Sequence, residues 1–284
     1  MGDEGRAGQP AGPPPRPGRV EEALSSRLFR LASPRMARVR QPRTPPHLRP
    51  FERVAIPRRR GAGSLSAVWF PTPRRVRGTV LLLHPWMEWG KAYFHRRGRI
   101  EALRRAGYHA LTVDLPGFGG SDPPAGFYDL DVDDAIGFAR GCAGGLPLHL
   151  WGVSSGGYWA HPVLARGAGV AGAMFEDVAP HLFEWGWRQT PWFRPAFLFF
   201  RTVFRTSYRF FDLRLHAPHL GARAVAYAAG AADPGIPAAD VRALAAAAGA
   251  ECLLVPGAGH LAAIKQARSA VIGLALETFR RAEG

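Results

Sequence analysis

Short apolar runs and helical patterns alternate along the chain from about residue 51 onward. The first two runs, "FERVAI" and "SLSAVWF", predict two strands joined by the turn-prone stretch "PRRRGAG". Later runs are almost continuously apolar, which is typical of strands that are buried on both faces. These later runs are "GTVLLLH", "HALTVDL", "LPLHLWGV", "VAGAMFED", "ARAVAYAAG" and "ECLLV".

Stretches of helical pattern lie between these runs. "RRGRIEALRRAGY" ends on Gly107, as a helix C-cap would, and "DLDVDDAIGFARGC" has an acidic start that suits the helix dipole. "AADVRALAAAAG" predicts another helix, and a last one is expected from about Ala263 to Arg281. Strands that alternate with helices predict an α/β fold of three layers, with a mainly parallel sheet covered by helices on both faces.

Residues 180–216 break this alternation. After Pro195, a favoured first helical residue, aromatic residues repeat at helical spacing and arginines recur at every fourth position. The aromatic row is Phe197, Phe200, Phe204, Tyr208 and Phe211, and the arginine row is Arg201, Arg205 and Arg209. We expect a short helical cap, whose aromatic side chains either pack on the domain or wall an apolar substrate pocket.

Residues 1–50 are expected to form an extension that precedes a single domain over residues 51–284. Residues 1–19 are rich in Gly, Pro and Arg and predict disorder, and residues 41–50 resemble a linker. Between them, "VEEALSSRLFRLA" has the pattern of a short basic amphipathic helix, with an apolar stripe of Val20, Leu24, Leu28 and Leu31. Such a helix packs on the domain, stays unformed or docks on a membrane surface. A membrane contact is left open and is not predicted.

Charge and composition restrict the expected partners. The formal charge is +15, and residues 1–60 hold 14 arginines and 5 acidic residues, which places +9 in that segment. The sequence has no helix-turn-helix, zinc or RNA-binding motif, so no nucleic-acid partner is expected. Cys142 and Cys252 lack the spacing of metal ligands, and no metal is expected. With no apolar run near the roughly 20 residues that span a bilayer and no apolar signal segment, we expect a cytoplasmic protein. The oligomeric state is left open.

The stretch from Gly152 to Gly156 carries the strongest chemical signal. It reads Gly-Val-Ser-Ser-Gly, a G-x-S-x-G pattern that follows a buried strand and precedes a predicted helix. A serine on such a strained turn has its neighbours at −2 and +2 crowded together, so glycine suits both places. Ser154 is therefore the candidate nucleophile rather than only a residue in a tight turn. Ser155 is a poorer candidate, because Val153 occupies its −2 position.

A serine nucleophile needs a base and an acid that orients the base. His260 follows the last predicted strand, and Asp233 follows the strand before it. Because reactive groups collect at the carboxyl ends of parallel strands, both side chains are expected near Ser154. Asp177, after another strand, is the rival acid.

The order Ser154, Asp233, His260 and these contexts resemble the α/β-hydrolase fold family over roughly residues 51 to 284. "VDLPGFGGSD" is similar to the family's Asp-x-x-Gly-x-Gly-x-Ser turn, and its aspartate is taken as structural. "LLLHPWMEWG" stands where the family has its oxyanion loop. The resemblance implies that the backbone N–H groups of Trp86 and Ser155 hold the oxyanion. Proline stands at position 85 where the family has glycine, so Met87 is an alternative donor.

The resemblance implies a serine hydrolase that cleaves an ester and needs no cofactor, and the aromatic composition alone suggests an apolar acyl or alcohol group in the substrate. The chain is rich in aromatic residues around the expected pocket, and the candidate substrate-binding residues are Trp89, Trp185, Trp187, Phe197 and Phe200, with Trp192 nearby. Two alternatives stay open. One is an acyltransferase or thioesterase with the same triad, and the other is a catalytically silent binding protein on this fold.

Overall fold

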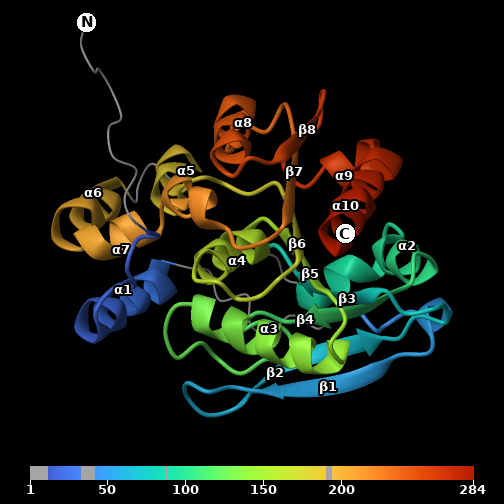
Figure 1. The fold of residues 1–284 in the computed structure, drawn as a ribbon. Coiled ribbons are helices and arrows are strands. Elements are labelled where there is room, and N and C mark those ends of the chain that lie inside the picture. The colour runs from blue at the N-terminus through green and yellow to red at the C-terminus, as the bar shows by residue number, and fades with distance from the viewer. Residues whose placement is uncertain (1–11, 33–41, 87–88, 190–193) are drawn as a thin grey trace, which may run out of the picture.

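A central sheet organises the computed structural model, which describes residues 12–32, 42–86, 89–189 and 194–284. Within these residues eight strands pair in the order β1-β2-β4-β3-β5-β6-β7-β8 (Figure 1). The strands are β1 (Glu52–Pro57), β2 (Ser64–Phe70), β3 (Gly78–Leu83), β4 (Tyr108–Val113), β5 (Leu148–Val153), β6 (Gly172–Glu176), β7 (Ala224–Gly230) and β8 (Glu251–Val255). Strand β2 pairs antiparallel with β1 and β4, and every other pair is parallel. The expected mainly parallel sheet is confirmed.

Helices cover both faces of the sheet, as the alternating pattern predicts (Figure 1). One face packs against α2 (Arg99–Arg105), α9 (Ala263–Gln266) and α10 (Arg268–Glu283). The other packs against α3 (Asp129–Ala143), α4 (Ser155–Ala165) and α8 (Ala238–Ala247). The strands β3, β5 and β6 are buried along their whole length, which explains why their sequences are apolar without alternation.

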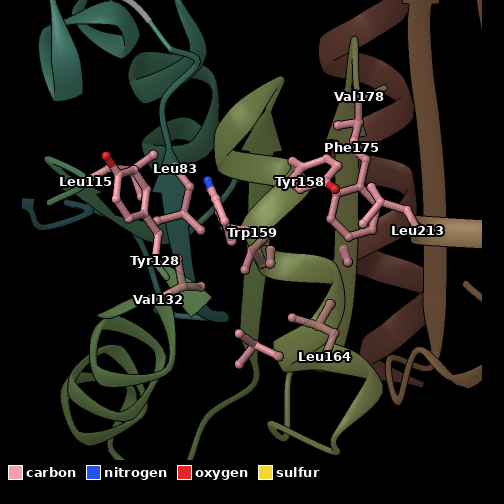
Figure 2. Close-up of a cluster of buried hydrophobic side chains, with 14 of the residues drawn as sticks. Leu83, Leu115, Tyr128, Val132, Tyr158, Trp159, Leu164, Phe175, Val178 and Leu213 are labelled. Carbon is pink, nitrogen blue, oxygen red and sulfur yellow. The ribbon is translucent and has the colours of Figure 1, made fainter. Parts of the chain in front are cut away.

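The core beside α4 is largely aromatic. Figure 2 shows Trp159 of α4 between Tyr128 and Tyr158. The ring centroids of Trp159 lie 5.2 Å from Tyr128 and 5.6 Å from Tyr158. Leu213, near the end of the cap, lies in the same cluster, as do Phe183 and Phe200 of the cap helices, so the cap is part of the hydrophobic core and not a detached lid.

The cap between β6 and β7 contains three helices where the sequence suggests a repeating pattern. They are α5 (Leu182–Gln189), α6 (Arg194–Val203) and α7 (Arg205–Phe210), followed by the short 3-10 turns η4 (Leu213–Leu215) and η5 (Ala217–His219). Helix α6 ends before Phe204, because the φ of −102° and ψ of 58° at Phe204 are not helical. The aromatic row is therefore divided between α6 and α7. Four rings of this row contact Phe183, and Phe200, Phe204 and Phe211 are buried, which favours the packing role of these aromatics.

The last predicted helix is also divided. Residue Ala267 has a φ of −127° and a ψ of 48°, which separates α9 from α10. The single helix expected from about Ala263 to Arg281 is therefore wrong in this detail. The break turns the chain at the point where it leaves the His260 loop and packs along the sheet.

The N-terminal segment is more ordered than its composition predicts. The expected helix is present as α1 (Arg19–Ala32), but Arg16, inside the stretch expected to be disordered, pairs with the buried Asp129 and Glu22. In the expected linker, η1 (Pro46–Leu48) places Leu48 in the core. Residues 16–25 therefore pack on the domain through ion pairs and hydrogen bonds, and residues 46–48 do so through the apolar side chain of Leu48. Residues 1–11 and 33–41 lie outside the described residues.

The helices in the described part of the chain include none that is long and apolar enough to cross a bilayer.

Candidate active site

Ser154 stands on a strained turn between β5 and α4. Its backbone has a φ of 48° and a ψ of −115°, and its N–H donates to the carbonyl oxygen of Glu176 at 2.7 Å. A Cβ on Gly152 would lie 2.4 Å from the Cα of Gly157, and one on Gly156 would lie 2.2 Å from the carbonyl oxygen of Leu83. Both glycines are thus required by close backbone contact, which is the reason for the G-x-S-x-G pattern.

The structure brings Ser154, His260 and Asp233 together in a line. The Oγ of Ser154 lies 3.2 Å from Nε2 of His260, and Nδ1 of His260 lies 2.7 Å from Oδ2 of Asp233. The other oxygen of Asp233 accepts from the N–H groups of Gly235 and Ile236 at 2.8 and 3.1 Å. Because the carboxylate accepts the proton on Nδ1, Nε2 is left free to accept from the serine hydroxyl.

The charges around this line stabilise the ionised form of the acid and the protonated form of the base relative to their other forms. Burial acts to raise the pKa of Asp233, but the hydrogen bond and charge of His260, with two backbone N–H donors, outweigh it and lower the pKa. Burial acts to lower the pKa of His260, but Asp233, Asp177 and Glu176 outweigh it and raise the pKa. The site therefore stabilises an imidazolium.

Asp177 lies beside this line but does not replace Asp233. It is fully buried with a φ of 52°, and its two oxygens accept from the N–H groups of Gly230 and Leu261 at 2.9 and 3.1 Å. Burial and the charge of Glu176 raise its pKa to about 7. Asp177 thus connects the end of β7 to the loop after His260, while Asp233 takes the hydrogen bond at the imidazole.

Three side chains of the site are also of the types that hold metal ions. Ligand atoms of Asp177, Asp233 and His260 lie within 4.8 Å of one another, and among the described residues no other group of three or more His, Cys, Asp or Glu side chains does so. The carboxylate oxygens already accept from backbone N–H groups or the imidazole. The donor set is therefore satisfied as a hydrogen-bond network and does not favour a metal.

The expected oxyanion loop is held against the start of α4. Ser155 is the first residue of α4, so its N–H has no partner within the helix. His84 of the loop accepts at Nε2 from the N–H of Leu115, which follows β4, at 2.9 Å, so Nδ1 carries the proton and donates to the carbonyl oxygen of Pro85 at 2.7 Å. Burial lowers the pKa of His84, which keeps the ring neutral in this arrangement.

The two residues after His84 are the expected sites of the oxyanion loop, Pro85 and Trp86. The ring of Trp86 stacks on Tyr128 with centroids 5.9 Å apart and meets Phe118 edge-on at 5.3 Å. Pro85 has no N–H to offer, and Met87 lies outside the described residues. The oxyanion roles of Trp86 and Ser155 stay predictions.

The candidate substrate-binding aromatics do not gather in one place. Trp185 lies against the loop of Asp233, since a Cβ on Gly235 would lie 3.0 Å from its Nε1. Trp187 and Phe197 instead line a cavity of about 300 Å³ within the cap, and its lining includes no triad residue.

The remaining aromatic candidates are occupied by other contacts. Phe200 is buried against Phe183, with ring centroids 4.7 Å apart. Trp89 lies under the guanidinium of Arg96 at 4.6 Å, and Trp192 lies outside the described residues. Of these candidates Trp185 is the one that the described contacts place next to the triad.

A buried ion pair next to the site was not predicted from the sequence. It includes Glu176, the residue whose carbonyl oxygen accepts from the N–H of Ser154. Arg99 and Glu176 are both fully buried, and the Nη2 of Arg99 donates to both carboxylate oxygens at 2.7 Å. The indole N–H of Trp151 donates to Glu176 at 3.3 Å. The signal in the sequence is the acidic pair Glu176-Asp177 at the end of a fully buried strand, where one acid must find a partner.

Comparisons with known proteins agree on the fold. Residues 80–272 match the model of the Alpha/beta hydrolase family. An esterase of Pyrococcus furiosus superposes with a TM-score of 0.71 at 17% identity, covering 87% of this chain and 97% of that chain. A thermostable carboxyl esterase from Bacillus coagulans gives 0.63 at 16% identity, covering 81% and 98%. A thermophilic esterase from Thermogutta terrifontis gives 0.59 at 20% identity, covering 82% and 100%. Among curated proteins no match was found.

Proposed function

The chain belongs to the α/β-hydrolase family, and on this premise we propose that it is a serine hydrolase that cleaves ester bonds. Ser154 is the nucleophile, His260 the general base and Asp233 the acid that orients the base. The observation that carries the proposal is the continuous hydrogen-bonded line from the hydroxyl of Ser154 through the imidazole to Asp233.

The proposed reaction proceeds through an acyl-enzyme. As the Oγ of Ser154 attacks the ester carbonyl carbon, Nε2 of His260 takes the hydroxyl proton. Asp233 stabilises the imidazolium that forms, in keeping with the raised pKa of His260. The imidazolium then protonates the leaving alcohol, and the ester C–O bond breaks. A water molecule, deprotonated by His260, then attacks the acyl-enzyme. The bond from the acyl carbon to Oγ breaks, His260 returns the proton to Ser154, and the acid is released.

The negative charge on the carbonyl oxygen would be held by backbone N–H groups. Ser155 supports this role because its N–H lies at the start of α4, where the helix leaves donors unpaired. The second donor is Trp86, in the loop that His84 holds in place. Each such donor is worth about 3–4 kcal/mol of transition-state stabilisation.

An apolar ester is the substrate class that this site favours. Trp185 lies beside the loop of Asp233, and the ring of Trp86 packs with Phe118 and Tyr128 near the oxyanion loop. Aromatic walls of this kind bury acyl chains or aryl groups more favourably than small polar groups. Transfer of the acyl group to an alcohol, amine or thiol would use the same residues, and it differs only in the acceptor.

The first test is hydrolysis of p-nitrophenyl esters of rising chain length by the full chain and by Ser154→Ala. The proposal expects turnover that is lost in Ser154→Ala, with the fold retained by circular dichroism. A fluorophosphonate should label the parent on Ser154 and leave the variant unlabelled. The chain-length optimum then reports the size of the acyl pocket.

A matched control is Ser269→Ala, which removes an exposed serine from α10. This variant should hydrolyse and label like the parent. An ester turnover that survives Ser154→Ala would refute the nucleophile. Labelling of Ser154 without hydrolysis of any ester, but with transfer to an added acceptor, would replace hydrolysis by acyl transfer. If the parent shows no labelling and no turnover, a catalytically silent binding protein is favoured.

A further inference from the structure

Exposed apolar side chains are concentrated on one end of the molecule. Among the described residues, the large apolar side chains with high exposure are Val20, Leu24, Leu146, Trp187, Leu198, Phe199 and Val203. With the exception of Leu146, all of them belong to α1, α5 and α6, and Figure 1 shows α1, α6 and α7 together on one side of the sheet. Scattered exposed apolar residues need no explanation, but a gathering of them does.

Helix α6 is apolar on both its inner and its outer side. Phe200 points inward and is buried against Phe183. On the outer side, Leu198, Phe199 and Val203 are 49%, 45% and 56% exposed. A helix that is apolar all round is normally buried, so packing within the domain explains only the inner side of α6.

Helix α1 has its polar side turned inward and its apolar side outward. Glu22, Ser25 and Ser26 are buried, while Val20 and Leu24 are 75% and 45% exposed. Burying Glu22 is costly in free energy, and Arg16 and Arg60 offset that cost with ion pairs. The domain thus uses the polar side of α1 and leaves its apolar side for another partner.

The charge around these apolar side chains is positive. Residues 194–210 contain four arginines and no acidic residue. Arg201, Arg205 and Arg209 are exposed and form no ion pair within the described part of the chain. The acidic groups of α1 do not offset this charge on the outside, because Glu22 is buried and Glu21 accepts from the N–H of Ser207 in α7.

We propose that the outer sides of α1 and α6, together with the start of α7, dock on an anionic lipid bilayer. We call this protein surface the docking face. Its residues are Val20, Leu24, Leu198, Phe199, Val203, Arg201 and Arg205. Apolar side chains enter the acyl boundary while the arginines meet lipid phosphates, as in other interfacial amphipathic helices. A second copy fits poorly, because a twofold contact would bring identical arginines face to face. Nucleic acid fits poorly, because its phosphates could pair with the arginines but would leave the apolar side chains of the docking face in contact with water.

The test measures sedimentation of the full chain with vesicles. The chain should bind vesicles with about one-third phosphatidylserine and bind phosphatidylcholine vesicles weakly. Raising salt from about 0.1 to 1 M, which shortens the Debye length from about 10 to 3 Å, should weaken binding. The double variant Arg201→Gln/Arg205→Gln should bind the anionic vesicles about 25-fold more weakly, from about fivefold per arginine. Phe199→Gln/Val203→Gln should weaken binding to both kinds of vesicle.

The matched control removes one exposed apolar residue and one exposed arginine elsewhere, as Leu146→Gln/Arg105→Gln. It should bind like the parent, and so should Ser154→Ala, because docking does not depend on the proposed chemistry. Only variants whose urea unfolding midpoint equals that of the parent are compared. A loss of binding in these variants does not come from misfolding. Equal binding of parent and docking-face variants, or no preference for anionic lipid, would overturn the proposal. Binding to polyglutamate without binding to vesicles would also overturn it, in favour of an acidic protein.

Discussion

Breaking the buried ion pair between Arg99 and Glu176 should destabilise the protein more than removing both partners together. The two test substitutions are Arg99→Met and Glu176→Leu, made singly and in combination. Each single substitution leaves an unpaired charge in a site with no solvent contact. The double variant leaves none.

The geometry of the pair sets the expected magnitude. One nitrogen, Nη2 of Arg99, serves both carboxylate oxygens, while the Nε and Nη1 of the same guanidinium have no hydrogen-bond partner among the described residues. The guanidinium lies 5.0 Å from the ring of Tyr93 and 5.4 Å from that of Trp151, which recovers part of the desolvation cost. The attraction between Arg99 and Glu176 is therefore only slightly larger than the free energy lost by removing both charges from water.

Each single substitution is expected to cost about 3–5 kcal/mol of unfolding free energy. The double variant loses the hydrogen bond from the indole of Trp151 to Glu176 but carries no buried charge. It should cost about 1–3 kcal/mol, the usual penalty for one unsatisfied buried donor.

Urea unfolding followed by tryptophan fluorescence measures these free energies, provided that the slope with urea is equal in all four proteins. If each charge is compensated by the other, the double variant is more stable than either single variant. If the double variant is as unstable as the sum of the two singles, the two charges act independently. The account of Arg99 as a compensated buried charge is then wrong.

Three further predictions concern the site itself. Asp177 is partly ionised near neutral pH, since its pKa is about 7, and Asp177→Asn removes that charge, so the pKa of His260 should fall and the acidic limb of the kcat/KM profile should move to lower pH; an unmoved limb would contradict this coupling. Asp233→Asn should lower kcat by about 10³–10⁴-fold in steady-state assays, because the amide favours the wrong imidazole tautomer, whereas a loss under tenfold would point to another acid. Gly156→Ala should abolish soluble, cooperatively unfolding protein or fluorophosphonate labelling, since its Cβ would meet the backbone of β3; normal labelling would refute the packing argument.

The sheet and the candidate site were predictable because their signals are local. Ser154, Asp233 and His260 each follow a strand that its apolar run identifies, and parallel strands bring their carboxyl ends to one edge. The order of the strands, by contrast, comes from pairing between distant segments. The sequence alone therefore ranked Asp233 above Asp177 by position, while their contacts distinguish the two roles.

The N-terminal segment and the cap were less predictable because distant or subtle contacts decide them. Arg16 finds Asp129 across 113 positions in the chain, a pairing that no periodicity reports. The stripe of α1 was visible in the sequence, but the side that faces the protein is the polar one. The break at Phe204 divides a regular aromatic row, since tertiary packing of the rings outweighs the local helical preference.

The contact between α1 and α7 makes these two helices one cooperative unit. Glu21 accepts from the N–H of Ser207, and the hydroxyls of Ser25 and Ser207 lie 3.1 Å apart in a buried place. Local opening of the cap must therefore release a segment that lies more than a hundred residues earlier in the chain. In hydrogen exchange, amides of α1 and α7 should share one opening free energy, and a ligand that orders either helix will slow exchange in the other.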